Sequence, residues 1–139
     1  MFESPVSDLR PEAFWLVATV LMTSVLWIPY IVNRVIELGL WTAIRNPQPE
    51  KPPRAAWAMR AIRAHTNAVE NLVLFAPLVV LALTTGRTSE VTAAAAGVYF
   101  YARLAHYFVY LFGLPLRTIV FAIGLGACFT IALALLGVV

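Results

Sequence analysis

Residues 13–32 read AFWLVATVLMTSVLWIPYIV and contain no charged side chain. At a rise of about 1.5 Å per residue, a helix of this length matches a hydrocarbon core of roughly 30 Å. The segment is too long for the core of a signal peptide, and Glu3, Asp8 and Glu12 precede it in place of a basic leader. We therefore expect a retained transmembrane helix. Pro29 should kink it, because proline leaves the carbonyl four residues earlier without its helical partner.

Three more segments have the length and polarity of membrane-spanning helices. Helical periodicity resumes near residue 54 and continues to about residue 84, residues 91–112 carry the single charge of Arg103, and residues 118–139 carry none. Four prolines within residues 47–53 exclude a helix through that loop. The prediction is an all-α, integral membrane four-helix bundle, a single domain with spans at about 13–38, 54–84, 89–112 and 116–138.

The composition of the whole chain agrees with a membrane protein. Of its 139 residues, 61% are hydrophobic and 12% are charged, whereas about a quarter of the residues of a soluble domain are charged. The net charge is +3, but nine of the ten basic residues are arginines scattered among apolar segments. We expect no nucleic-acid partner, since that needs a contiguous basic surface. The single cysteine, Cys128, excludes an internal disulfide.

Basic residues are distributed unequally between the two sides of the predicted bundle. The side of the first and third loops holds Arg34, Arg45, Lys51, Arg54 and Arg117, and the side of the termini holds Arg10 and Arg87. Cytoplasmic loops of membrane proteins are enriched in lysine and arginine. The sequence therefore predicts a cytoplasmic proline-rich loop, with both termini on the opposite side of the membrane.

Two of the predicted helices carry a stripe of polar side chains. Spacing of about 100° per residue gathers one stripe on the second helix within about 100° and another on the third within about 60°. The members are Arg60, Arg63, Asn67, Glu70 and Asn71 on the second helix, and Tyr99, Arg103, His106 and Tyr110 on the third. An arginine at the centre of a membrane helix costs about 2.5–3.5 kcal/mol, so these positions are the strongest indication of a functional site.

Structural roles account for some of these residues taken singly. Arg60 and Arg63 would also suit arginines that extend from a first helical turn to the membrane interface. Glu70 lies seven residues deeper than Arg63 and needs a cationic partner, which a purely structural pair with Arg63 or Arg103 would supply.

The two histidines do not predict a metal or haem site. His65 points about 160° away from the centre of the first stripe. His106 has no second ligand at a spacing typical of metal sites. We expect no metal.

The two stripes suit an anionic ligand of a particular kind. Arginine forks bind carboxylates in a bidentate manner, so several converging arginines favour a small molecule with more than one carboxylate. Glu70 would receive an ammonium group. A peptide-like cofactor fits better than a phosphate, because the sequence has no glycine-rich nest and no pair of carboxylates for magnesium.

Two segments resemble the signatures of a known family. Residues 60–71, RAIRAHTNAVEN, resemble the first signature of the membrane-associated proteins in eicosanoid and glutathione metabolism, which include the microsomal glutathione transferases and leukotriene C4 synthase. Residues 102–104, with Tyr110 and Arg117 after them, are similar to the second signature. The resemblance covers the whole chain in helix count and loop order. It implies a homotrimer in the lipid bilayer, with glutathione held between adjacent protomers near the cytoplasmic face.

The resemblance also implies roles for individual residues. Arg63, Asn67 and Glu70 would hold the glutathione backbone, and Arg117 would be the catalytic arginine that stabilises the thiolate. The remaining pocket residues would be Arg60, Arg103, His106 and Tyr110. His106 and Asn71 stand where leukotriene C4 synthase has tyrosines, which favours the broader microsomal transferase branch.

The predicted function is that of a membrane glutathione transferase or peroxidase, with a role in detoxification at a bacterial inner membrane. Glutathione would serve as co-substrate, and its ionised thiol would attack a lipophilic electrophile or a lipid hydroperoxide. The main alternative is a non-catalytic lipid-binding or scaffold member of the same fold. A small transporter in which Glu70 carries protons is a third interpretation, against which the lack of an inverted repeat speaks.

Overall fold

Each of the long apolar segments forms helix in the computed structural model, which describes residues 8–45 and 51–139. The described residues contain no strand, so the predicted all-α fold is confirmed. The helices are α1 (Pro11–Val25), α2 (Ile28–Leu38), α3 (Leu40–Ile44), α4 (Ala56–Thr84), α5 (Glu90–Leu111) and α6 (Arg117–Leu135).

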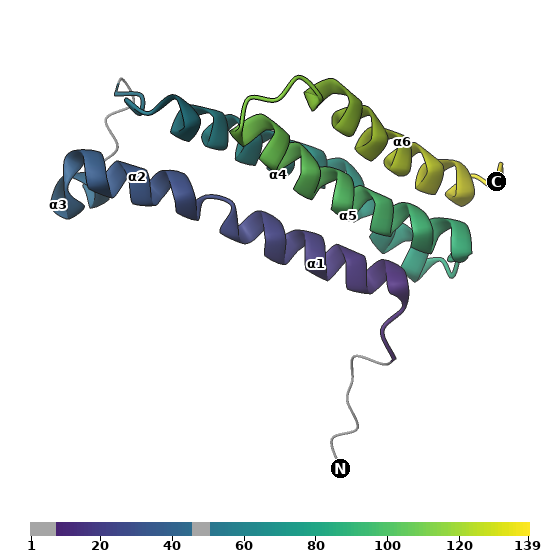
Figure 1. Cartoon of the computed structure of the whole chain (residues 1–139). Coiled ribbons are helices and arrows are strands. Elements are labelled where there is room, and N and C mark those ends of the chain that lie inside the picture. Colours follow the sequence, from purple (N-terminus) through teal and green to yellow (C-terminus); the bar gives the residue numbers. More distant parts are fainter. Residues whose placement is uncertain (1–7, 46–50) are drawn as a thin grey trace, which may run out of the picture.

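The long helices lie side by side in an up-and-down bundle (Figure 1). The start of α1 and the end of α6 lie at one end of the bundle, and the starts of α4 and α6 lie at the other. Helix α5 is central, because it packs against α1, α4 and α6. The polar stripe of the third predicted helix is therefore inside the bundle.

Three of the described helical segments are long and apolar enough to cross a membrane, judged by length and composition. They are Pro11–Leu38, Ala56–Thr84 and Arg117–Leu135. The central helix α5 is not among them, and its buried residues include Thr92, Arg103 and His106. The polar stripes thus lie on α4 and on α5, and α5 packs against α1, α4 and α6.

The expected kink near Pro29 is a two-residue break at Leu26 and Trp27, which separates α1 from α2. Pro29 is in the first turn of α2, where a proline is tolerated because it has no N–H to leave unpaired. The Tyr107 hydroxyl donates a hydrogen bond to the Leu26 carbonyl at 3.2 Å. A side chain of α5 therefore satisfies a backbone group at the break, which membrane-embedded backbone requires.

Polar contacts also close the two ends of the bundle. At the end with the termini, Ser89 caps α5 and the Thr92 hydroxyl donates to the buried carboxylate of Glu12 at 2.5 Å. At the other end, the Glu37 carboxylate accepts the backbone N–H of Ala55 at 3.2 Å, just before α4. The Ser89 and Glu37 side chains thus accept backbone N–H groups at the starts of α5 and α4, where these donors have no helical partner.

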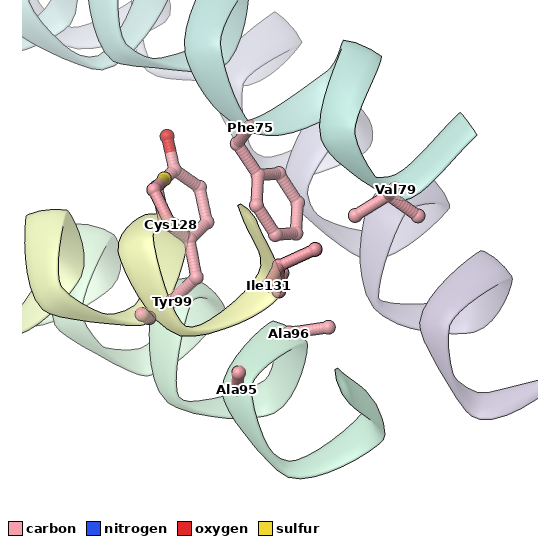
Figure 2. Packing of buried hydrophobic residues seen from close by; sticks show 8 residues of the cluster. Phe75, Val79, Ala95, Ala96, Tyr99, Cys128 and Ile131 are labelled. Atoms are coloured by element: carbon pink, nitrogen blue, oxygen red, sulfur yellow. The ribbon is translucent and has the colours of Figure 1, made fainter. Parts of the chain in front are cut away.

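The largest apolar cluster lies between α4, α5 and α6 (Figure 2). The rings of Phe75 and Tyr99 are stacked, with centroids 3.8 Å apart. Cys128 and Ile131 of α6 pack against the same cluster, and the Cys128 thiol is buried. Membrane helices associate through this kind of close packing, since lipid tails are as apolar as the side chains themselves.

Replacing Phe75 with alanine should lower the unfolding free energy by about 3 kcal/mol. The substitution removes a buried ring, leaves a cavity in its place, and ends the stacking contact with Tyr99. The matched control is Phe129→Ala on α6, since Phe129 is 60% exposed whereas Phe75 is 0% exposed. Thermal unfolding in detergent measures both variants. Equal midpoints for the two would contradict the packing described above.

Candidate functional site

A cavity of about 280 Å³ lies beside the turn between α5 and α6. This turn is at the end of the bundle where α4 and α6 start (Figure 1). Its lining includes Arg60, Tyr110, Gly113, Arg117 and Thr118. Three of these residues, Arg60, Tyr110 and Arg117, were predicted as site residues from the sequence. Among the described residues, the lining of the cavity has two arginines and no carboxylate, so it favours an anion.

The backbone turn that shapes this cavity depends on Gly113. Its φ is +68°, and its N–H donates to the Tyr110 carbonyl at 3.1 Å, while the next N–H, from Leu114, donates to the Val109 carbonyl at 2.8 Å. This is the Schellman ending of a helix, which needs a residue with positive φ. The Arg60 Nε donates to the Leu111 carbonyl at 2.9 Å and so binds α4 to the same turn.

Arg117 is the first residue of α6 and is exposed at the rim of the cavity. Its guanidinium carbon lies 5.2 Å from the centroid of the Tyr110 ring. This cation–π contact holds the side chain at the cavity, and no acceptor within residues 8–45 and 51–139 occupies its N–H donors, which suit an anion. The geometry is suitable for stabilising a developing or full negative charge.

Arg103 lies deeper in the bundle and is 2% exposed. Its Nη1 donates to the Asn67 Oδ1 at 3.0 Å, and its Nη2 donates to the Phe121 carbonyl at 3.2 Å. The guanidinium carbon lies 5.5 Å from the Tyr99 ring centroid and 5.1 Å from that of Phe121. The two polar stripes are therefore joined by a hydrogen bond between Asn67 and Arg103.

His106 lies between Arg103 and Tyr110 on the same face of α5 and is 4% exposed. Its ring centroid is 5.7 Å from that of Tyr110. His106 thus connects the buried Arg103 to the cavity rim. His65 lies elsewhere, since its Nδ1 is 2.8 Å from the Tyr30 hydroxyl on α2.

Arg63 and Glu70 occupy the outer face of α4 and are exposed. Seven residues separate them, which is about 10 Å along a helix axis. Burial of the stripe increases around the helix toward the bundle, since Asn67 is half-buried and Asn71 is buried. Ionisable groups on a membrane-facing surface are costly unless they are paired. The two charged side chains thus lie outside the bundle that this chain forms.

One chain thus brings together only part of the predicted site. Arg60, Tyr110 and Arg117 share a cavity, Asn67 and Arg103 are hydrogen-bonded behind it, and Arg63 and Glu70 lie on the open face of α4.

The sequence prediction did not include Thr118, which lines the cavity, or the Phe121 carbonyl, which accepts from Arg103. In the sequence, the one signal for Thr118 is that it directly follows Arg117. A backbone carbonyl has no sequence signal.

Comparison with known proteins gives a single result. A model of the MAPEG family matches residues 13–137. Neither the curated proteins nor the solved structures yield a significant match.

Proposed function

Because this chain belongs to the MAPEG family of helical membrane proteins with roles in glutathione and eicosanoid metabolism, we propose that it is a membrane glutathione transferase with peroxidase activity. Members of the family generally use glutathione. The observation that carries the proposal is the cavity lined by Arg60, Tyr110 and Arg117. It offers two guanidinium groups to an anion.

The proposed ligand-holding residues come from more than one protomer. The exposed Arg63 and Glu70 are a cation and an anion on one open helix face. Glutathione has two carboxylates and an ammonium group, so Arg63 would bind a carboxylate and Glu70 the ammonium. We propose a homotrimer, in which a neighbouring protomer covers this face and glutathione lies between protomers. This arrangement removes both charges from lipid.

Arg117 is the proposed catalytic residue. A free thiol has a pKa near 8.5, and a guanidinium against the sulfur lowers a thiol pKa by about one or two units. The thiol proton leaves to water, and the thiolate attacks an electrophilic carbon, forming a C–S bond and releasing the leaving group. With a hydroperoxide, the thiolate attacks the terminal oxygen, an S–O bond forms, the O–O bond breaks, and the alkoxide takes a proton from water and leaves as the lipid alcohol. A second glutathione then converts the sulfenic product to glutathione disulfide and water.

The proposed site for a lipophilic substrate is a groove on the outer surface of the same protomer. An almost wholly apolar groove of about 490 Å³ lies over α1, α5 and α6, with Trp15, Gly97, Tyr101 and Val120 in its lining. Val120 is one helical turn after Arg117. A hydrophobic electrophile or lipid hydroperoxide would thus approach from the bilayer along α6. The end of the bundle where α4 and α6 start, which carries Arg54 and Arg117, would face the cytoplasm of a bacterial inner membrane.

Mass measurement of the detergent-solubilised complex tests the proposal. We expect the mass of three copies of the chain with glutathione bound. An activity assay on the same preparation should show turnover of a lipophilic aryl halide or a lipid hydroperoxide. Glutathione binding without any turnover would favour the alternative, a non-catalytic lipid-binding or scaffold protein. A complex that takes up no glutathione would refute both the site and the activity.

A further inference from the structure

We propose that Arg103 is a positioning residue, which does not touch glutathione but fixes the amide of Asn67 and links it to the helix that carries Arg117. This inference rests on the proposed function, because it concerns how the same site is built. It assigns Arg103 a role distinct from that of Arg60, Arg63 and Arg117.

The first observation is that the Arg103 guanidinium faces the interior of its own protomer. The side chain is 2% exposed, and it lies between the rings of Tyr99 and Phe121. Its two amino groups donate to Asn67 Oδ1 and to the Phe121 carbonyl. Both ends of the fork are therefore occupied by protein acceptors, and ligand atoms cannot reach the fork without rearrangement of the bundle.

The second observation concerns the direction of the Asn67 amide. A guanidinium has only donors, so it accepts nothing and must face the Oδ1 of Asn67 rather than the Nδ2. With Oδ1 held at 3.0 Å from Arg103 Nη1, the Nδ2 donors of Asn67 are left for a ligand. The Asn67 side chain is half-buried and so remains accessible. The site therefore presents an N–H at this position, which suits a carboxylate or a peptide carbonyl of glutathione.

The third observation is the close fit between Arg103 and α6. A Cβ atom at Gly124 would lie 2.5 Å from Arg103 Nη2 and 2.9 Å from Nε, both too short. Only glycine allows the guanidinium to lie against the helix backbone here. The Phe121 carbonyl, which accepts from Nη2, is one turn after Arg117. Arg103 thus connects the residue proposed to hold the glutathione backbone with the helix that presents the proposed thiolate-stabilising arginine.

Packing alone does not account for this arginine. The Arg103 Nε and the Tyr99 hydroxyl are buried without a hydrogen-bond partner among the described residues. Apolar residues of similar volume usually hold helices together at least as well as a buried charge. A fixed amide orientation is what the arginine adds that an apolar residue cannot.

A double-mutant cycle tests the inference on the full-length protein in detergent. The variants are Arg103→Lys, Asn67→Ala and the double variant, with glutathione affinity as the readout. Lysine retains the charge but cannot donate to both acceptors in the same fixed fork. We expect Arg103→Lys to weaken glutathione binding about tenfold when Asn67 is present, and by less than about twofold when it is alanine, because residues in one hydrogen-bond network are coupled. Equal losses in both backgrounds would mean that Arg103 contacts the ligand itself and would overturn the inference.

A second pair of variants keeps the test decisive if Arg103→Lys does not fold. Gly124→Ala should displace the guanidinium and weaken binding, again only when Asn67 is present. Gly126→Ala is the matched control, because a Cβ at Gly126 meets no atom within 4 Å. Equal effects of the two glycine variants would also overturn the inference. Wild-type protein that binds no glutathione would refute the proposed function instead, which separates the two failures.

Discussion

Replacing Arg117 with alanine should largely abolish the ultraviolet absorbance of the glutathione thiolate in the complex at pH 7 while changing glutathione affinity by less than about fivefold. The side chain is exposed at the cavity rim and held over Tyr110, so its loss removes a cation without disturbing the core. A thiol with a pKa near 8.5 is only about 3% ionised at pH 7, whereas lowering its pKa by one to two units, or about 1.4–2.7 kcal/mol, makes the thiolate a major species. At pH 7 the ionised fraction, and with it the turnover number, should therefore fall about eight- to 25-fold.

Absorbance titration against pH in wild type and variant measures this effect. Arg87→Ala is the matched control, since Arg87 is also exposed but donates to the Leu135 carbonyl at the opposite end of α6. The Arg87 variant should retain the thiolate signal. An undiminished thiolate signal in the Arg117 variant would refute the assigned role.

The second large effect is expected at Glu70. Glu70→Gln keeps the size of the side chain but removes the negative charge proposed to receive the glutathione ammonium. Hydrogen bonds to charged groups contribute about 1.5–3 kcal/mol, so binding should weaken roughly ten- to 150-fold. Calorimetry with glutathione measures the loss. Glu90→Gln, an exposed glutamate at the other end of the bundle, is the control and should bind normally.

A modified ligand sharpens the Glu70 test. Glutathione with an acetylated amino group has no ammonium, so it should bind wild type as weakly as glutathione binds the Glu70→Gln variant. The variant itself should not distinguish the two ligands. If the variant still preferred the free amine by the wild-type ratio, Glu70 would not be the ammonium partner.

Much of the fold follows from the linear pattern of polarity. The apolar runs formed α1, α4 and α6, helix is interrupted just before Pro29, and Pro52 and Pro53 lie outside any helix. The rest of the predicted proline-rich loop, with Pro47 and Pro49, lies outside the described residues. The family was also predicted correctly from residues 60–71 and from the spacing of Arg103, Tyr110 and Arg117. These features are local, since backbone geometry and the solvent act on each segment separately. The individual site roles stay predictions.

Neighbouring helices decide what each polar side chain contacts. The sequence left Arg63 and Arg103 open as partners for Glu70, but in the fold Arg103 donates to Asn67. The reason is the glycine at position 124, which lets the guanidinium lie against α6 and away from the outer face of α4. No periodicity within α5 contains this information.

The sequence alone determined that the chain is built for a bilayer, that it consists of helices, and that two of them carry polar stripes. It could do so because hydrophobic length and helical period are properties of single segments. Only the tertiary structure decided which members of those stripes share a cavity, which one is buried as a support, and which two are left on an open face. That division depends on contacts between helices far apart in the chain, where one glycine and one carbonyl determine where a charge is held.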